Sequence, residues 1–333
     1  MASVRAATAA AVVCIAVLLA MLGSGAGEVR RFAVGEPATV ASPAAAWQYD
    51  AIGLDRVPLE VVAKASPVTV AVVDTGADVS ASDFAGRSVS TFSVLKPGAA
   101  SDANGHGTFV ASIVARTAPN ARLLVIGAAA ADGSMRDEDE AAAIRYAVRH
   151  GARVINLSVA GTSTSTVERR ALADAARRGV LVVAAAGNDY AGGNPVEYPA
   201  ALLQPVGSRG AGGTGLVVGA TDASGARAAF SGAGSWLSLA APGVGILGAL
   251  APTAAGAADA RTTASVGIAS GTSYAAPQVA GAAALLFGVN QKLTARQVAA
   301  ILKRTASGHG TWTPETGFGT IDIAAAVAAA AGP

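Results

Sequence analysis

The chain of 333 residues is short of several residue types that many functions require. It has one cysteine, Cys14, which lies inside an apolar run near the N-terminus. A mature protein that starts after this run would have no disulfide and no thiol nucleophile. Charged residues make up 14% of the chain, the formal net charge is +2, and no run of Lys or Arg occurs. Because phosphate binding needs clustered cations, we expect no nucleic-acid partner.

Hydrophobic residues make up 52% of the chain, which predicts a folded protein with a large core. The length allows one large domain or two ordinary ones. No internal repeat occurs, and we expect one compact domain over residues 47–331. A monomer is the default expectation.

The N-terminus has the composition of a secretory signal peptide over residues 1–26. The basic segment "MASVR" precedes the apolar run "AATAAAVVCIAVLLAMLG", and small residues follow. The alternative is an uncleaved membrane anchor, since the run has about 18 residues. Residues 27–46 are rich in Ala, Pro and Gly and are interpreted as a linker or a short N-terminal arm. We therefore expect a secreted or cell-envelope protein, with no stable membrane insertion after signal cleavage.

From Trp47 onward, apolar strand patterns alternate with helical patterns. Continuous β-branched runs such as "VTVAVV" (68–73) are typical of strands buried on both faces. Alternating strands and helices predict an α/β fold, with a mostly parallel sheet covered by helices on both faces. The expected strands are 68–73, 121–128, 152–159, 180–187 and 215–220, and the expected helices are 107–116, 138–151, 166–179, 274–289 and 294–306.

Three polar residues stand where such a sheet gathers its functional groups, at the ends of strands and the starts of helices. Asp74 follows the strand 68–73, His106 lies between two glycines, and Ser273 precedes the long apolar helix 274–289. Each has a plain structural interpretation: a turn residue, a loop histidine and a helix cap. Together they supply what a serine nucleophile needs, namely a base and a third group that orients the base.

The segments around these residues are specific. "VAVVDTGAD", "NGHGTFVAS" and "SGTSYAAPQVAG" resemble the three active-site blocks of the subtilisin-like serine proteases (the subtilase family, peptidase family S8). Their order in the chain and the 32-residue separation of Asp74 and His106 are typical of that family. The resemblance implies the three-layer subtilisin-like fold. It also implies that Ser273 is the nucleophile as well as a helix cap, that His106 is the general base and that Asp74 orients His106.

The resemblance extends to residues expected to bind substrate. "VVAAAGND" matches the segment whose asparagine completes the oxyanion hole, which assigns that role to Asn188. "DGSM" around Gly133 resembles the edge strand that pairs with extended substrate. Glu197 falls where the floor of the P1 pocket is expected, and its carboxylate would favour Lys or Arg at P1, the substrate residue that supplies the scissile carbonyl. The expected walls of that pocket are Ser158, Val159, Ala160 and Gly161 on one side and Ala185, Ala186 and Gly187 on the other.

No metal or cofactor is expected. The calcium-binding loop that many relatives carry after the catalytic-histidine helix is absent from the sequence, and the acids of "RDEDE" (136–140) suit the first turn of a helix. "GAGGTG" (210–215) precedes a strand instead of following one, so it is interpreted as a surface loop and not a dinucleotide fingerprint.

The sequence thus predicts a secreted serine endopeptidase that acts on polypeptides. The short N-terminal arm together with "GTSYAAPQVAG" also resembles the mycosin branch of the family. The main alternative is a catalytically silent protein of the same fold that acts as a binding or scaffolding module. The retention of Asp74, His106, Asn188 and Ser273 argues against that alternative.

Overall fold

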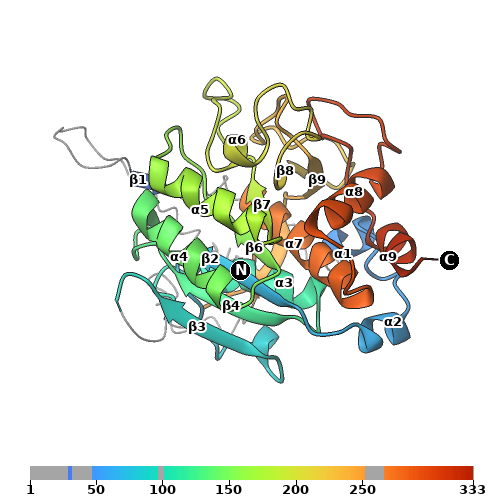
Figure 1. Ribbon diagram of the computed structural model, residues 1–333, viewed down its shortest axis with the longest axis horizontal. Coiled ribbons are helices and arrows are strands. Elements are labelled where there is room, and N and C mark those ends of the chain that lie inside the picture. The colour runs from blue at the N-terminus through green and yellow to red at the C-terminus, as the bar shows by residue number, and fades with distance from the viewer. Residues whose placement is uncertain (1–28, 32–46, 97–100, 252–265, 333) are drawn as a thin grey trace, which may run out of the picture.

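A seven-stranded parallel sheet forms the centre of the molecule (Figure 1). The computed structural model describes residues 29–31, 47–96, 101–251 and 266–332, and the counts below refer to these residues. The strand order is β3-β4-β2-β6-β7-β8-β9, and every neighbouring pair is parallel. The strands are β2 (Thr69–Asp74), β3 (Val89–Ser93), β4 (Arg122–Gly127), β6 (Val154–Leu157), β7 (Leu181–Ala185), β8 (Leu216–Thr221) and β9 (Leu239–Pro242).

Helices cover both faces of the sheet. Successive residues of each strand point to opposite sides, and since most strand residues are apolar, both faces must be shielded from water. In β2, Val70 and Val72 belong to one hydrophobic core, while Ala71 and Val73 belong to the other. The first core includes α3 (His106–Thr117) and α7 (Thr272–Val289), and the second includes α4 (Asp137–Arg149) and α5 (Thr166–Arg177). The structure confirms the expected three-layer α/β architecture.

Helix α7 is buried on all sides. Every residue from Thr272 to Gly288 is buried, and the helix packs against α3 and against strands β6 to β9. A helix that is apolar all round belongs in the interior of a large protein. Its stripe of small side chains allows close packing, since a Cβ at Gly281 would lie 2.6 Å from the Cβ of Thr117 on α3.

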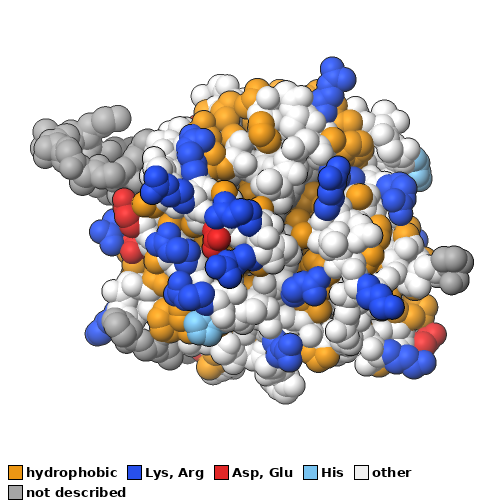
Figure 2. Space-filling model, viewed as in Figure 1, with side chains coloured by type: hydrophobic (Ala, Val, Ile, Leu, Met, Phe, Trp, Pro, Cys, Tyr) orange, Lys and Arg blue, Asp and Glu red, His pale blue; other side chains and the backbone are white. Residues whose placement is uncertain are grey.

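The opposite layer carries many of the positive charges. Figure 2 shows arginines gathered over α4 and α5, which lie side by side in Figure 1. The exposed arginines of these two helices and their ends are Arg136, Arg145, Arg149, Arg169, Arg170, Arg177 and Arg178. Asp174 pairs with the last two at 3.2 and 3.1 Å. These are solvated polar faces of amphipathic helices.

Short elements complete the molecule. They are β1 (Val29–Arg31), α1 (Trp47–Ala51), α2 (Leu59–Lys64), a 3₁₀ turn (Ser82–Phe84), β5 (Ser134–Arg136), α6 (Ala200–Leu203), β10 (Ile246–Ala249), β11 (Val266–Ala269), α8 (Ala295–Thr305) and α9 (Ile323–Ala331). Strand β1 pairs antiparallel with β5, and β10 pairs antiparallel with β11. A strand therefore forms inside the segment 27–46 that the sequence predicts to be a linker or arm. The signal-peptide prediction, 1–26, lies outside the described residues, and the boundaries of the 47–331 domain stay a prediction.

One expectation about α7 is wrong. The helix begins at Thr272 and its N-cap is Gly271, so Ser273 is the second helical residue and does not cap the helix. The backbone of Gly271 is extended there, and this residue has no side chain that could cap the helix. Among the described residues, none of the helices is long and apolar enough to span a bilayer.

Candidate active site

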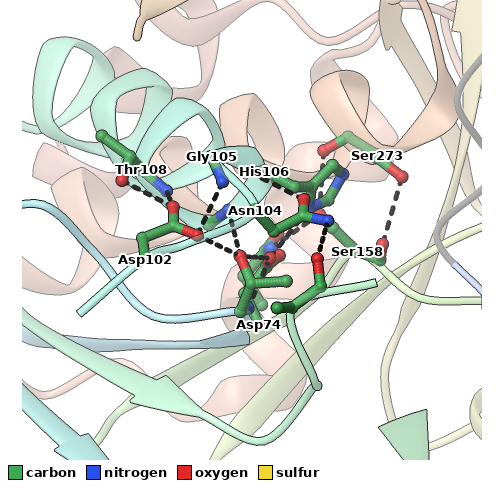
Figure 3. Close-up of polar contacts among 12 residues, drawn as sticks. Asp74, Asp102, Asn104, Gly105, His106, Thr108, Ser158 and Ser273 are labelled. Atoms are coloured by element: carbon green, nitrogen blue, oxygen red, sulfur yellow. Dashed lines mark hydrogen bonds and ion pairs between the residues drawn. The ribbon is translucent and has the colours of Figure 1, made fainter. Parts of the chain in front are cut away.

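Asp74 and His106 form a buried pair at the carboxyl edge of the sheet. Asp74 is the last residue of β2, and His106 is the first residue of α3. The Nδ1 atom of His106 lies 2.8 Å from Oδ1 of Asp74, and both side chains are almost completely shielded from solvent (Figure 3). An imidazole that donates its Nδ1 proton to this carboxylate keeps Nε2 as an acceptor, which is the tautomer required of a general base.

A second buried carboxylate holds the loop that carries His106. Oδ1 of Asp102 accepts hydrogen bonds from the Gly105 N–H at 2.7 Å and from the Thr75 hydroxyl at 2.8 Å. Oδ2 accepts from the Thr108 N–H at 2.7 Å and from the Thr108 hydroxyl at 2.6 Å. Asp102 therefore ties the start of α3 to the turn after Asp74 (Figure 3).

Thr75 completes this connection. Its N–H donates to Oδ1 of Asp74 at 2.8 Å, and its hydroxyl oxygen accepts from the Gly107 N–H at 2.9 Å. Sequence reasoning missed Asp102 and Thr75. The available signal was the acid four residues before His106, in a segment that is not helical.

Ser273 lies at the buried start of α7, with 3% of its surface exposed. Its hydroxyl donates to the carbonyl oxygen of Ser158 at 3.1 Å, and the Ser158 hydroxyl donates to the Ser273 carbonyl at 2.8 Å. The ring of Tyr274, the next residue, is centred 5.6 Å from the imidazole of His106. The start of α7 therefore lies beside the start of α3 and the end of β6. Turning the hydroxyl from Ser158 toward His106 is the adjustment that nucleophilic attack would require.

Asn188 follows β7 and points its amide oxygen at α7. Oδ1 accepts from both the N–H and the hydroxyl of Thr272, each at 2.9 Å. Since one end of the amide is fixed in this way, Nδ2 faces the opposite direction. A side-chain N–H donor beside the positive end of a long helix is suited to stabilise an oxyanion.

The two segments expected to form the walls of the P1 pocket converge on Glu197. Gly161 and Tyr198 exchange two backbone hydrogen bonds, of 3.0 and 2.8 Å. Gly187 has φ +94°, and a Cβ there would lie 1.9 Å from Oε2 of Glu197. Ser158, Val159, Ala185, Ala186 and Gly187 are buried, while Ala160 and Gly161 are half-buried. Burial raises the pKa of Glu197 to about 7, and the nearby charge of Asp189 adds to the shift.

The segment expected to resemble an edge strand, "DGSM" around Gly133, is a strand only from Ser134 onward, and its role in binding substrate stays a prediction. Gly133 has φ +81°, and its N–H donates to the Ala130 carbonyl at 2.9 Å, so it lies in a tight turn. Strand β5 begins one residue later, at Ser134, because the left-handed backbone of Gly133 cannot continue a strand. The turn lies close to the histidine loop, since Nδ2 of Asn104 donates to the Ala131 carbonyl at 2.9 Å.

Within the part of the chain that the structure describes, no group of three or more His, Cys, Asp or Glu side chains is arranged to hold a metal ion. The grouping of an acid, an imidazole and a serine at one edge of a sheet is instead that of the serine hydrolases.

Comparison with known proteins identifies the group within that class. The sequence pattern that describes the subtilase family (peptidase family S8) matches residues 65–319. An alkaline protease of Alkalihalobacillus alcalophilus is 37% identical over 270 residues, and subtilisin BL of Lederbergia lenta is 36% identical over 270 residues. Both alignments cover 78% of this chain. The chain therefore belongs to the subtilase family.

Solved structures agree with this assignment. Fervidolysin from Fervidobacterium pennivorans, a keratinolytic enzyme related to subtilisin, superposes with a TM-score of 0.72 and 28% identity, over 86% of this chain and 46% of that one. A cold-adapted subtilisin-like serine proteinase gives a TM-score of 0.63 and 30% identity, over 78% of this chain and 88% of that one. The chain spans 64% of the length of the alkaline protease and 91% of subtilisin BL. These relatives give no specific support to the mycosin branch.

Proposed function

We propose that this protein is an exported serine endopeptidase that hydrolyses polypeptides at Ser273. The observation that carries the proposal is the buried 2.8 Å contact between Asp74 and His106, beside the start of the helix that bears Ser273. A buried carboxylate that accepts a hydrogen bond from Nδ1–H of a histidine stabilises the imidazolium that forms when Nε2 takes up a second proton. Membership of the subtilase family supports the same activity.

In the proposed mechanism, Nε2 of His106 takes the hydroxyl proton as Oγ of Ser273 attacks the scissile carbonyl carbon. The negative charge of Asp74 stabilises the imidazolium that forms. The carbonyl oxygen becomes an oxyanion, which accepts hydrogen bonds from Nδ2 of Asn188 and from the backbone N–H of Ser273. His106 then gives its proton to the leaving amine, and water repeats the sequence to release the acyl group from Ser273.

The test is labelling with a fluorophosphonate, which reacts only with an activated serine. Wild type, Ser273→Ala and His106→Ala are compared, and casein cleavage is followed in parallel. We expect labelling and cleavage in wild type and neither in the two variants. A folded wild type that shows neither reaction would contradict the proposal and favour the silent binding module.

Export is proposed on the signal-peptide composition of residues 1–26. The measurement is the N-terminal sequence of protein recovered from the culture medium and from the cell envelope. A mature N-terminus near residue 27 supports secretion, and an intact N-terminus in the membrane fraction supports the anchored alternative.

A further inference from the structure

Glu197 is a buried carboxylate that the catalytic mechanism does not use. Its side chain lies against the Cα atom of Gly187, where a Cβ would come within 1.9 Å of Oε2 and 2.6 Å of Oε1. The residue is 7% exposed. Among the described residues, its carboxylate takes part in no hydrogen bond and no ion pair. Leaving an acid in such a place costs stability, so a partner that arrives with the substrate would explain it.

Two chain segments lead from Ser273 to this carboxylate. The first starts at Ser158, which is hydrogen-bonded to Ser273 in both directions, and ends three residues later at Gly161, which is paired with Tyr198. Three residues of extended chain span about 10 Å. The carboxylate of Glu197 is thus within reach of a long side chain whose backbone carbonyl lies at Ser273.

The second segment is shorter. Gly187 contacts the carboxylate of Glu197, and the next residue, Asn188, is hydrogen-bonded to Thr272 at the start of α7. Glu197 therefore contacts the residue that directly precedes the proposed oxyanion donor. The substrate side chain nearest to Asn188 is the one attached to the scissile carbonyl, which is P1.

The charges around Glu197 have the sign that attracts a cation. Asp189, in the loop after β7, is the charged group whose field acts on Glu197, and it is also an acid. On the neighbouring helix α5, the guanidinium of Arg169 lies 5.8 Å from the ring centroid of Tyr198, and it is not among the charges that shift the pKa of Glu197. An entering ammonium or guanidinium group would meet the carboxylate of Glu197 in the field of a second acid.

We propose that Glu197 determines the specificity of this protein by pairing with lysine or arginine at P1 of the substrate. This inference rests on the proposed function. It makes the protein selective for basic residues, whereas an apolar pocket floor would select an apolar P1 side chain. Since burial raises the pKa of Glu197 to about 7, the pairing strengthens as the pH rises through that value and the side chain becomes ionised.

The first experiment measures kcat/KM for peptide anilides that differ only at P1, with Arg, Lys, Gln or norleucine. Wild type is compared with Glu197→Gln, and Glu138→Gln is the matched control on an exposed side chain of α4. We expect the ratio of Arg to norleucine to fall at least about 30-fold in Glu197→Gln and to stay unchanged in Glu138→Gln. In wild type, the same ratio should rise between pH 5.5 and 8.5. Taking the ratio cancels the pH dependence of His106, because both substrates use the same base.

The second experiment does not depend on turnover. Peptides that end in Arg or in norleucine are titrated into the Ser273→Ala variant by calorimetry, with and without Glu197→Gln. Tighter binding of the Arg peptide that disappears in the double variant supports the inference. Equal affinities in the single variant would overturn it.

The two proposals can fail separately. Fluorophosphonate labelling together with hydrolysis that is indifferent to P1 would leave the protease function in place and overturn the role of Glu197. A folded wild type without labelling would overturn the protease function. In that case a preference for the Arg peptide in calorimetry would still support cation recognition by Glu197, and equal binding would refute it.

Discussion

Replacing Asp102 by asparagine tests whether a second buried carboxylate holds His106, the proposed general base, in place. Each oxygen of Asp102 accepts one backbone N–H, from Gly105 and from Thr108, and one hydroxyl. An asparagine has one oxygen, so an NH₂ group must face one of these two N–H donors. The hydroxyls can rotate, but a backbone N–H cannot.

The expected loss of stability follows from the number of hydrogen bonds that Asp102 accepts. One buried N–H without an acceptor costs about 1–3 kcal/mol, and the other bonds weaken because the acceptor is no longer charged. We therefore expect Asp102→Asn to lower the free energy of unfolding by about 2–4 kcal/mol in urea denaturation. A domain has about 5–15 kcal/mol of stability, so the variant should still fold.

The effect on activity comes from the loop that carries His106. A displacement of about 1 Å at a catalytic group costs up to about 100-fold in rate. We expect kcat of Asp102→Asn to fall about 10- to 100-fold, with KM within about threefold of wild type, because Asp102 does not lie among the segments expected to bind substrate.

Asp222→Asn is the matched control. Asp222 is half-buried, and a single oxygen, Oδ1, accepts all three hydrogen bonds of its side chain, from Ser224 and Ala226, so the amide oxygen of asparagine can replace it. We expect a change below about 0.5 kcal/mol and an unchanged kcat. If the two variants behaved alike, the reasoning about Asp102 would be refuted.

Three further predictions concern Glu197, Asn188 and Gly210. The folded state raises the pKa of Glu197 from 4.5 to about 7, so the contribution of this group to stability is fully present below pH 4.5 and is lost as the pH rises through 7. The free energy of unfolding of Glu197→Gln, relative to that of wild type, should therefore be higher at pH 8.5 than at pH 4 by up to about 3 kcal/mol. Denaturation curves of both proteins at the two pH values measure this difference. Asn188→Ala should lower kcat about 100- to 1000-fold while circular dichroism shows a folded protein, and an unchanged kcat would exclude Asn188 from the oxyanion hole. Gly210→Ala should destabilise the protein by at least about 2 kcal/mol more than Gly193→Ala. Both glycines have positive φ, but a Cβ at Gly210 would lie 2.2 Å from the backbone carbonyl oxygen of Leu237, while a Cβ at Gly193 meets open space.

The sequence predicts the parts of the site whose residue types are restricted by chemistry. Asp74, His106 and Ser273 can be found because nucleophilic catalysis needs those groups in distinctive glycine-rich surroundings, and the β-branched runs predict the strands that position them. Asp102 could not be found in this way. An aspartate in a loop has many ordinary uses, and its four hydrogen bonds depend on how two distant turns approach each other.

The differences between prediction and structure arise where backbone conformation or a tertiary contact overrides the local preference of a residue. Ser273 was expected to cap α7 because serine is a favoured cap, but the extended backbone of Gly271 places the cap two residues earlier. The strand expected around Gly133 begins only at Ser134, because the left-handed backbone of Gly133 forms the turn before β5. Strand β1 escaped prediction because three residues carry little pattern, and its pairing with β5 is a tertiary contact.

The burial of α7 also bears on when the protein can act. This helix, which brings Ser273 to the other two groups, belongs to the last quarter of the chain and fills the space between α3 and four parallel strands. Parallel pairing joins segments far apart in sequence, so it forms slowly and only after long loops have closed. A ribosome-bound, translocating or half-folded chain would contain Asp74 and His106. The strands against which α7 packs would not yet be assembled, so Ser273 would not lie beside the other two residues. The order of assembly itself would thus delay proteolysis until folding is complete.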